Sequence, residues 1–195
     1  MNICVFASSS SKIDKIYFND ANKMGELIAK SGYDVVYGGS ELGLMGEVTK
    51  SAKSNGSKII GVMPEKLYNL GISKGACDEF ILTSDMRTRK AKMDELSKAV
   101  ICLAGGFGTV EELSEMIVQK QLGYSNKPIV ILNTNGYFDD LIKFFSRSID
   151  EKFAPVECRE IYYVAKTPND AINYVLNYKP RLIDYLKDKL AILKK

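Results

Sequence analysis

AVICLAGGFGTVEEL, residues 99–113, passes from an apolar run through a glycine-rich turn into the start of a helical pattern. An apolar run without polar alternation is typical of a strand that is buried on both faces of a parallel sheet. Glycines between a strand and a helix let the backbone approach a ligand where helix N–H groups attract anions. This segment therefore predicts a parallel α/β sheet with an anion site at a strand end.

The same alternation of short apolar runs and helical patterns extends in both directions along the chain. Because parallel strands need crossover helices, it predicts a doubly wound, mostly parallel, Rossmann-like sheet in three α/β/α layers. No linker divides the chain, so we expect residues 1–195 to form a single domain that ends in a helix at about 180–194. The expected strands are residues 3–7, 33–37, 58–63, 80–82, 99–103, 129–132 and 161–164, with an irregular loop at 65–78 and helices that include 44–54, 86–97 and 137–149.

The composition excludes several kinds of catalysis. The chain has no histidine, which rules out Ser-His-Asp triads, Cys-His pairs and histidine-ligated zinc.

No stretch reaches the roughly 18 apolar residues of a membrane helix, and the first residues do not resemble a signal peptide, so we expect a cytoplasmic protein without a membrane partner. A net charge of +3 gives no reason to expect nucleic acid. The cysteines have no CxxC spacing and are expected to be reduced structural thiols: Cys4, Cys77, Cys102 and Cys158.

Two other predicted strand ends are also rich in small residues. Residues 7–11 read ASSSS and residues 38–43 read GGSELG. In a doubly wound sheet these loops and the 104–109 loop meet at one edge, which favours a phosphate site over glycines that merely permit tight turns. The standard nucleotide signatures are absent: Leu44 stands where a P-loop has lysine, and no GxGxxG follows the first strand. A hydride-transfer enzyme is therefore disfavoured.

Two pairs of charged residues flank the predicted strand at 99–103. Arg89 and Lys90 lie in the first turns of one expected helix, and Glu111 and Glu112 open the next. The two pairs could face each other around a phosphorylated sugar. Two alternatives remain open: Thr109 to Glu112 fits a T-x-x-E capping box, which the spacing alone favours for Glu112, and Arg89 could be an ordinary solvated helix residue.

The segment from residue 86 onward resembles the Lonely Guy (LOG) family, phosphoribohydrolases that release a base from a nucleoside 5′-monophosphate and are often mislabelled lysine decarboxylases. The family signature PGGxGTxxE is similar to AGGFGTVEE at 104–112, and its upstream M-x-x-R-K is similar to MRTRK at 86–90. Further matches, in order between about residues 2 and 155, are CVFASSS at 4–10, YGGSELGLMG at 37–46, QLG at 121–123, KP at 127–128 and LNTNGY at 132–137.

Position by position, the resemblance implies that Arg89 and Glu112 are catalytic and that the protein is a homodimer. We expect no metal and no organic cofactor. The sequence departs from the family pattern at Ser8, Ser40, Thr88, Ala104, Val118 and Gln119, so the preferred base stays open while phosphate and ribose recognition are expected to be intact. The residues implied for substrate binding are Ser9, Ser10, Gly39, Met45, Lys90, Gly105, Gly106, Gly108, Thr109 and Glu111.

The favoured function is hydrolysis of the N-glycosidic bond of a nucleoside 5′-monophosphate, of the AMP or cytokinin riboside type, to free base and ribose 5-phosphate. A carboxylate beside the sugar stabilises the oxocarbenium-like transition state; Glu112 is expected to do this or to activate the water, and Arg89 to anchor the substrate and assist departure of the base. The main alternative is a non-catalytic carrier of a nucleotide or phosphorylated cofactor. A pyridoxal-phosphate decarboxylase would need a Schiff-base lysine, and none stands out.

Overall fold

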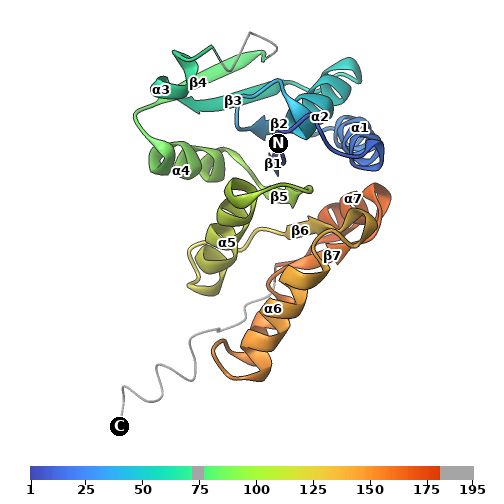
Figure 1. The fold of residues 1–195 in the computed structure, drawn as a ribbon, viewed down its shortest axis with the longest axis vertical. Helices are drawn as coiled ribbons and strands as arrows, with labels where there is room; N and C mark the ends of the chain where they lie inside the picture. Colours follow the sequence, from blue (N-terminus) through green and yellow to red (C-terminus); the bar gives the residue numbers. More distant parts are fainter. Residues whose placement is uncertain (72–76, 181–195) are drawn as a thin grey trace.

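The computed structural model describes residues 1–71 and 77–180 and arranges them around a β-sheet (Figure 1). The strands of this part of the chain are β1 (Asn2–Phe6), β2 (Asp34–Tyr37), β3 (Ile59–Pro64), β4 (Glu79–Thr83), β5 (Ala99–Cys102), β6 (Ile129–Leu132) and β7 (Tyr163–Ala165). They form one sheet in the order β4-β3-β2-β1-β5-β6-β7, and every neighbouring pair is parallel. The prediction of a doubly wound sheet is confirmed, and the sheet is parallel throughout.

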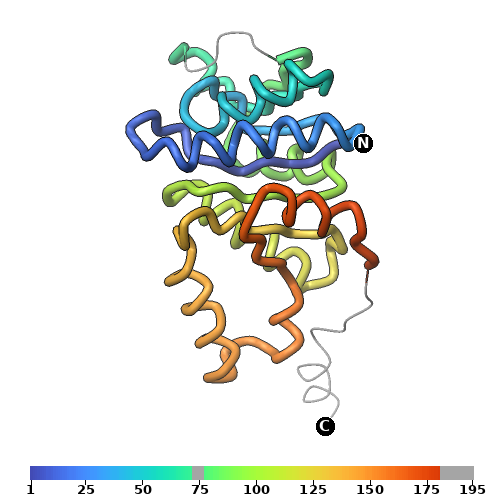
Figure 2. Tube along the Cα trace, turned by 90° about the vertical axis from the view of Figure 1, so that its right-hand side faces the viewer, coloured from blue at the N-terminus to red at the C-terminus, as the bar shows by residue number. Residues whose placement is uncertain are grey.

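Helices cover both faces of the sheet. On one face lie α1 (Lys15–Lys30), α2 (Gly43–Ser54) and α7 (Pro168–Asn177), which Figure 2 shows nearest the viewer. On the other face lie α4 (Met86–Leu96), α5 (Phe107–Gln121) and α6 (Asp139–Asp150). The short elements are α3 (Glu65–Tyr68) and two 3-10 turns, η1 (Thr134–Gly136) and η2 (Val156–Glu160). Within residues 1–71 and 77–180, no helix is long and apolar enough to span a bilayer.

The central strand β1 shows why an apolar run identified the strands. Ile3 and Val5 pack with the buried residues of α1, α2 and α7, whereas Cys4 and Phe6 pack with those of α4, α5 and α6. Because a helix layer covers each face, neither alternating set of side chains can be polar. The four cysteines are free thiols, three of them buried, as predicted.

The order of the strands fixes where a ligand can enter. β1 lies between β2 and β5, and the chain leaves β1 towards α1 on one face and leaves β5 towards α5 on the other. The loops that follow β1 and β5 therefore diverge from neighbouring strand ends. This topological switch point creates a crevice at the carboxyl edge of the sheet, where open α/β folds bind their ligands.

The structure differs from the predicted elements in local detail. The predicted irregular loop at 65–78 contains the helical turn α3, and β7 begins two residues later than the expected strand at 161–164. Ile161 is buried, but it follows the 3-10 turn η2 instead of lying in a strand, since burial alone does not distinguish the two. From residue 181 onward, the predicted C-terminal helix lies outside the described residues.

Candidate active site

The three loops with small residues meet at the carboxyl edge of the sheet, as the sequence predicts. The Ser8 N–H donates a hydrogen bond to the Ala104 carbonyl at 3.0 Å, which joins the loop after β1 to the loop after β5. The Ser8 carbonyl accepts from the N–H groups of Leu44 and Met45, at 2.9 and 3.2 Å. The backbone of one residue, Ser8, thus ties together the loops that precede α1, α2 and α5.

The first turn of α5 is not capped by a side chain. Gly106 is the N-cap residue, and Thr109 lies three residues further on, buried within the first turn. The capping-box interpretation of Glu112 is therefore wrong, because the helix starts three residues before the T-x-x-E motif requires. The N–H groups of this turn have no partner within the helix and carry the positive end of its dipole. They are available to an anion.

Glycines at this turn leave room for such an anion. A Cβ at Gly106 or at Gly108 would meet no described atom within 4 Å, so protein packing does not require glycine at either position. At Gly105, by contrast, a Cβ would collide with the side chain of Thr109. The first of these glycines is thus packed against the helix, while the other two border open space.

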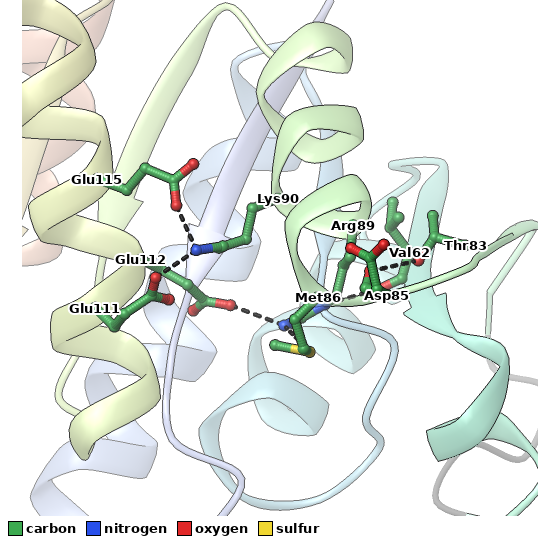
Figure 3. A network of polar contacts seen from close by, with 9 residues as sticks. All are labelled: Val62, Thr83, Asp85, Met86, Arg89, Lys90, Glu111, Glu112 and Glu115. Carbon is green, nitrogen blue, oxygen red and sulfur yellow. Dashed lines mark hydrogen bonds and ion pairs between the residues drawn. The ribbon is translucent and has the colours of Figure 1, made fainter.

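Arg89 and Glu112 form a buried ion pair between α4 and α5 (Figure 3). The Arg89 Nη1 atom lies 3.0 Å from Glu112 Oε1, and the two residues are only 8% and 7% exposed. The Arg89 Nε–H also donates to the Val62 carbonyl at 3.1 Å. Arg89 is therefore not a solvated helix residue, and the structure brings together the two residues expected to be catalytic.

The surroundings of Arg89 require small or apolar neighbours. A Cβ at Gly38 would collide with the guanidinium group and would approach the sulfur of Met45. The sulfur of Met86 lies 3.8 Å from Arg89 Nη1. Gly38 therefore allows the guanidinium to lie against the backbone at the end of β2. Sequence analysis missed Gly38, although its neighbour Gly39 in the same GG turn was named.

Burial changes the acidity of Glu112. Removal from water raises the pKa of the Glu112 carboxyl above its usual value, and the Arg89 guanidinium offsets only part of this effect. The negative charge of neighbouring Glu111 raises the pKa further. The carboxylate is thus poorly solvated and depends on Arg89 for its main stabilising contact.

Lys90 is held by carboxylates from α5. Its ammonium group pairs with Glu111 and with Glu115, as Figure 3 shows. Burial alone would lower the pKa of Lys90, but the hydrogen bonds to these two carboxylates outweigh it and raise the pKa. Sequence analysis named Lys90 and Glu111 but missed Glu115, which lies four residues after Glu111 and thus on the same face of α5.

The charges of the site are unevenly divided. Between α4 and α5, two cations face three carboxylates: Arg89 and Lys90 against Glu111, Glu112 and Glu115. This cluster favours a positive charge more than an anion, whereas the first turn of α5 favours an anion. The arrangement can therefore hold a phosphate at one end and stabilise a cationic sugar at the other.

The remaining predicted residues lie around the same edge. Ser9 and Ser10 are exposed in the loop after β1, where the Ser10 N–H donates to Ser8 Oγ at 3.0 Å. Gly39 adopts a φ of 81°, and its Cβ position faces Met63 and Phe80. In residues 1–71 and 77–180, no three His, Cys, Asp or Glu side chains are placed to share a metal ion.

A protein family and several curated plant proteins are similar to this chain in sequence. The model of a family described as "Possible lysine decarboxylase" matches residues 45–175. The rice (Oryza sativa subsp. japonica) protein "Probable cytokinin riboside 5'-monophosphate phosphoribohydrolase LOGL2" is 39% identical over 92% of this chain and 73% of its own length. The Arabidopsis thaliana "Cytokinin riboside 5'-monophosphate phosphoribohydrolase LOG3" is 36% identical over 91% of this chain and 83% of its own.

Solved structures show the same fold. A molybdenum cofactor (Moco) carrier protein from Chlamydomonas reinhardtii superposes with a TM-score of 0.69, is 28% identical, and is matched over 90% of this chain and 94% of its own. The structural genomics target TM1055 superposes with a TM-score of 0.70 at 20% identity, over 91% of this chain and 99% of its own. The fold thus occurs in a protein named as a carrier.

The ion pair generates a prediction about pH. Arg89→Met leaves Glu112 buried without its counter-ion and should destabilise the protein by about 3–5 kcal/mol at neutral pH. Because the folded-state pKa of Glu112 then lies further above its unfolded value, the folded state binds more protons, and stability should fall as pH rises from about 4 to 7. Urea unfolding of variant and wild type across this range measures the difference.

A double variant provides the control for this experiment. Arg89→Met/Glu112→Leu replaces the pair with apolar side chains and should recover most of the lost stability, with no added pH dependence. A pH-independent deficit in Arg89→Met would contradict the buried pairing.

Proposed function

The chain belongs to the Lonely Guy phosphoribohydrolase family, whose model carries the description "Possible lysine decarboxylase", and we propose that it hydrolyses the N-glycosidic bond of a nucleoside 5′-monophosphate. The products are the free base and ribose 5-phosphate. The observation that carries this proposal is the buried Arg89–Glu112 pair, because its carboxylate lies on α5, the helix whose uncapped first turn borders open space. The plant relatives are named for the same reaction on cytokinin riboside 5′-monophosphates.

The 5′-phosphate binds at the first turn of α5. Gly105, Gly106, Gly108 and Thr109 supply backbone N–H groups there, and the loop of Ser9 and Ser10 lies across the same edge of the sheet. Binding energy from a phosphate remote from the bond that breaks can orient the sugar against the catalytic groups. The phosphate thus places the anomeric carbon beside the carboxylate cluster.

Glu112 acts on the sugar. As the bond from C1′ to the base breaks, its electron pair leaves with the base and positive charge develops on the ribose. A poorly solvated carboxylate stabilises this charge more effectively than one in water, because the local dielectric is low. A water molecule bonds through its oxygen to C1′ and gives up one proton, which yields ribose 5-phosphate, and the departing base takes up a proton in its place.

Arg89 orients Glu112 and binds the departing base. Its Nη1 atom holds the carboxylate, while its Nη2 atom lies against the backbone at Gly38. A hydrogen bond from the guanidinium to the base stabilises the electron pair that the base takes with it. Lys90 and Glu111, which the family pattern assigns to substrate binding, act together, since each holds the other.

A carrier function is the alternative that the fold itself suggests, because a molybdenum cofactor carrier shares it. A carrier would bind its ligand at the same edge without turnover. Release of free base distinguishes the two functions.

A homodimer is part of the proposal. Exposed apolar side chains lie on the face formed by α4, α5 and α6: Met86, Phe107, Val118, Leu122 and Phe144. A second copy that covers these side chains would need to bury on the order of 1,600 Å² in all to be stable. Light scattering at micromolar concentration should give twice the 21.7 kDa of one chain; a monomer mass would contradict the dimer.

The proposed phosphate site predicts a strong preference for nucleotide over nucleoside. The purified protein should release adenine from AMP far faster than from adenosine, because adenosine lacks the group that the first turn of α5 binds. Chromatographic assay of free adenine measures both rates. Equal rates on the two compounds would contradict the phosphate assignment, and no base from any nucleoside monophosphate would favour the carrier.

The catalytic role of Glu112 predicts that turnover falls in Glu112→Gln protein that is still folded, whatever stability the variant loses with the buried ion pair. Glu112→Gln keeps the size of the side chain and one acceptor oxygen for Arg89 but removes the negative charge, so kcat on AMP should fall by about 100-fold or more. Glu95→Gln, at an exposed glutamate on α4 that pairs with Lys92, is the matched control and should keep normal activity. Near-normal turnover of a folded Glu112→Gln protein would remove Glu112 from the mechanism.

A further inference from the structure

Tyr137 contacts the glycine turn from outside the elements that form the site. It follows η1 in the loop between β6 and α6, and its hydroxyl donates a hydrogen bond to the Gly105 carbonyl at 2.9 Å. The two residues are 32 positions apart in the sequence. None of the chemistry proposed above uses this contact.

Tyr137 is 47% exposed, and two ring contacts and a rigid preceding turn orient its hydroxyl. The ring meets Tyr17 of α1 edge-on, with centroids 5.7 Å apart, and meets Phe138 at 5.0 Å. The preceding turn is shaped by Gly136, whose φ is 71°, and by the Asn133 side chain, which accepts from the Phe138 N–H at 2.8 Å. A tyrosine held by its ring and its backbone presents its hydroxyl in one direction.

The contact constrains a peptide that has little conformational preference of its own. The peptide bond after Gly105 joins two glycines, the residues with the widest choice of backbone angles. In a planar trans peptide the C=O and the following N–H point in opposite directions. A Gly105 carbonyl that faces Tyr137 therefore forces the Gly106 N–H to face away from Tyr137.

We propose that Tyr137 is a positioning residue for the phosphate: its hydroxyl locks the Gly105–Gly106 peptide so that the Gly106 N–H donates to the 5′-phosphate of the substrate. This inference rests on the proposed function, and it limits the effect of Tyr137 to binding of the phosphate. Binding of the base does not depend on it. Without the hydroxyl the peptide samples other orientations, and the N–H is aligned only part of the time.

Tyr137→Phe tests the proposal, since it removes one oxygen and keeps both ring contacts. The dissociation constant of ribose 5-phosphate, measured by calorimetry, should rise about tenfold, which corresponds to about 1.4 kcal/mol. KM for AMP should rise by a similar factor with kcat changed much less, while inhibition by free adenine stays the same. Tyr124→Phe is the matched control, because Tyr124 is 78% exposed at the opposite end of α5.

A second variant tests whether Tyr137 acts through the Gly106 N–H. Gly106→Pro removes this N–H, and the φ of −86° at Gly106 is near the value that proline imposes. Gly106→Pro alone should weaken ribose 5-phosphate binding, and adding Tyr137→Phe should cause little further loss. If Tyr137→Phe weakened ribose 5-phosphate binding by the same factor in the wild-type protein and in the Gly106→Pro variant, the proposal would be overturned.

Other outcomes also decide the matter. Unchanged ribose 5-phosphate binding in folded Tyr137→Phe, or equal weakening for ribose 5-phosphate and adenine, would overturn the proposal, and so would wild-type protein that does not bind ribose 5-phosphate. Failure of the proposed function has a different signature, namely no base release from AMP by the wild type. The ribose 5-phosphate comparison still decides the role of Tyr137 in that case.

Discussion

The site depends on one buried ion pair, between Arg89 on α4 and Glu112 on α5. Taking both charges out of water costs several kcal/mol per ion, and apolar side chains of similar size often stabilise a protein equally well or better. Several features nevertheless accommodate the pair: the Val62 carbonyl accepts from Arg89, and Gly38 leaves space for the guanidinium. An interaction that is costly for stability and yet closely supported agrees with the catalytic role that we propose for the pair.

Helix α5 gives the site its two chemically different ends. Its first turn presents uncapped N–H groups, and the side chains of Glu111, Glu112 and Glu115 begin less than two turns later. From Gly106 to Glu112 the helix rises about 9 Å, the scale of a sugar phosphate. In the proposed reaction, α5 therefore both binds the anion at its first turn and stabilises the developing cation beside Glu112. The hydrogen bonds that Ser8 and Tyr137 donate to Ala104 and Gly105 hold the preceding turn in place.

Sequence patterns predicted the fold and the meeting of the loops because both depend on local signals. Apolar runs identify strands covered on both faces, and strand ends of a parallel sheet share an edge. The sequence did not define the start of α5, since TVEE fits a capping box and only the structure shows that Gly106 is the N-cap residue. The contacts of Gly38 with Arg89 and of Tyr137 with Gly105 join distant segments, so no local pattern could reveal them.

The central claim is that the phosphate binds at the first turn of α5 and the sugar beside Glu112, less than two turns further along the same helix. A crystal structure with ribose 5-phosphate tests it most directly. The account predicts the phosphate within hydrogen-bond distance of the N–H groups of Gly106, Gly108 and Thr109, with the anomeric carbon facing Glu112 and the Arg89–Glu112 pair retained. A phosphate bound to Arg89 or Lys90, with Glu112 displaced from the sugar, would contradict it.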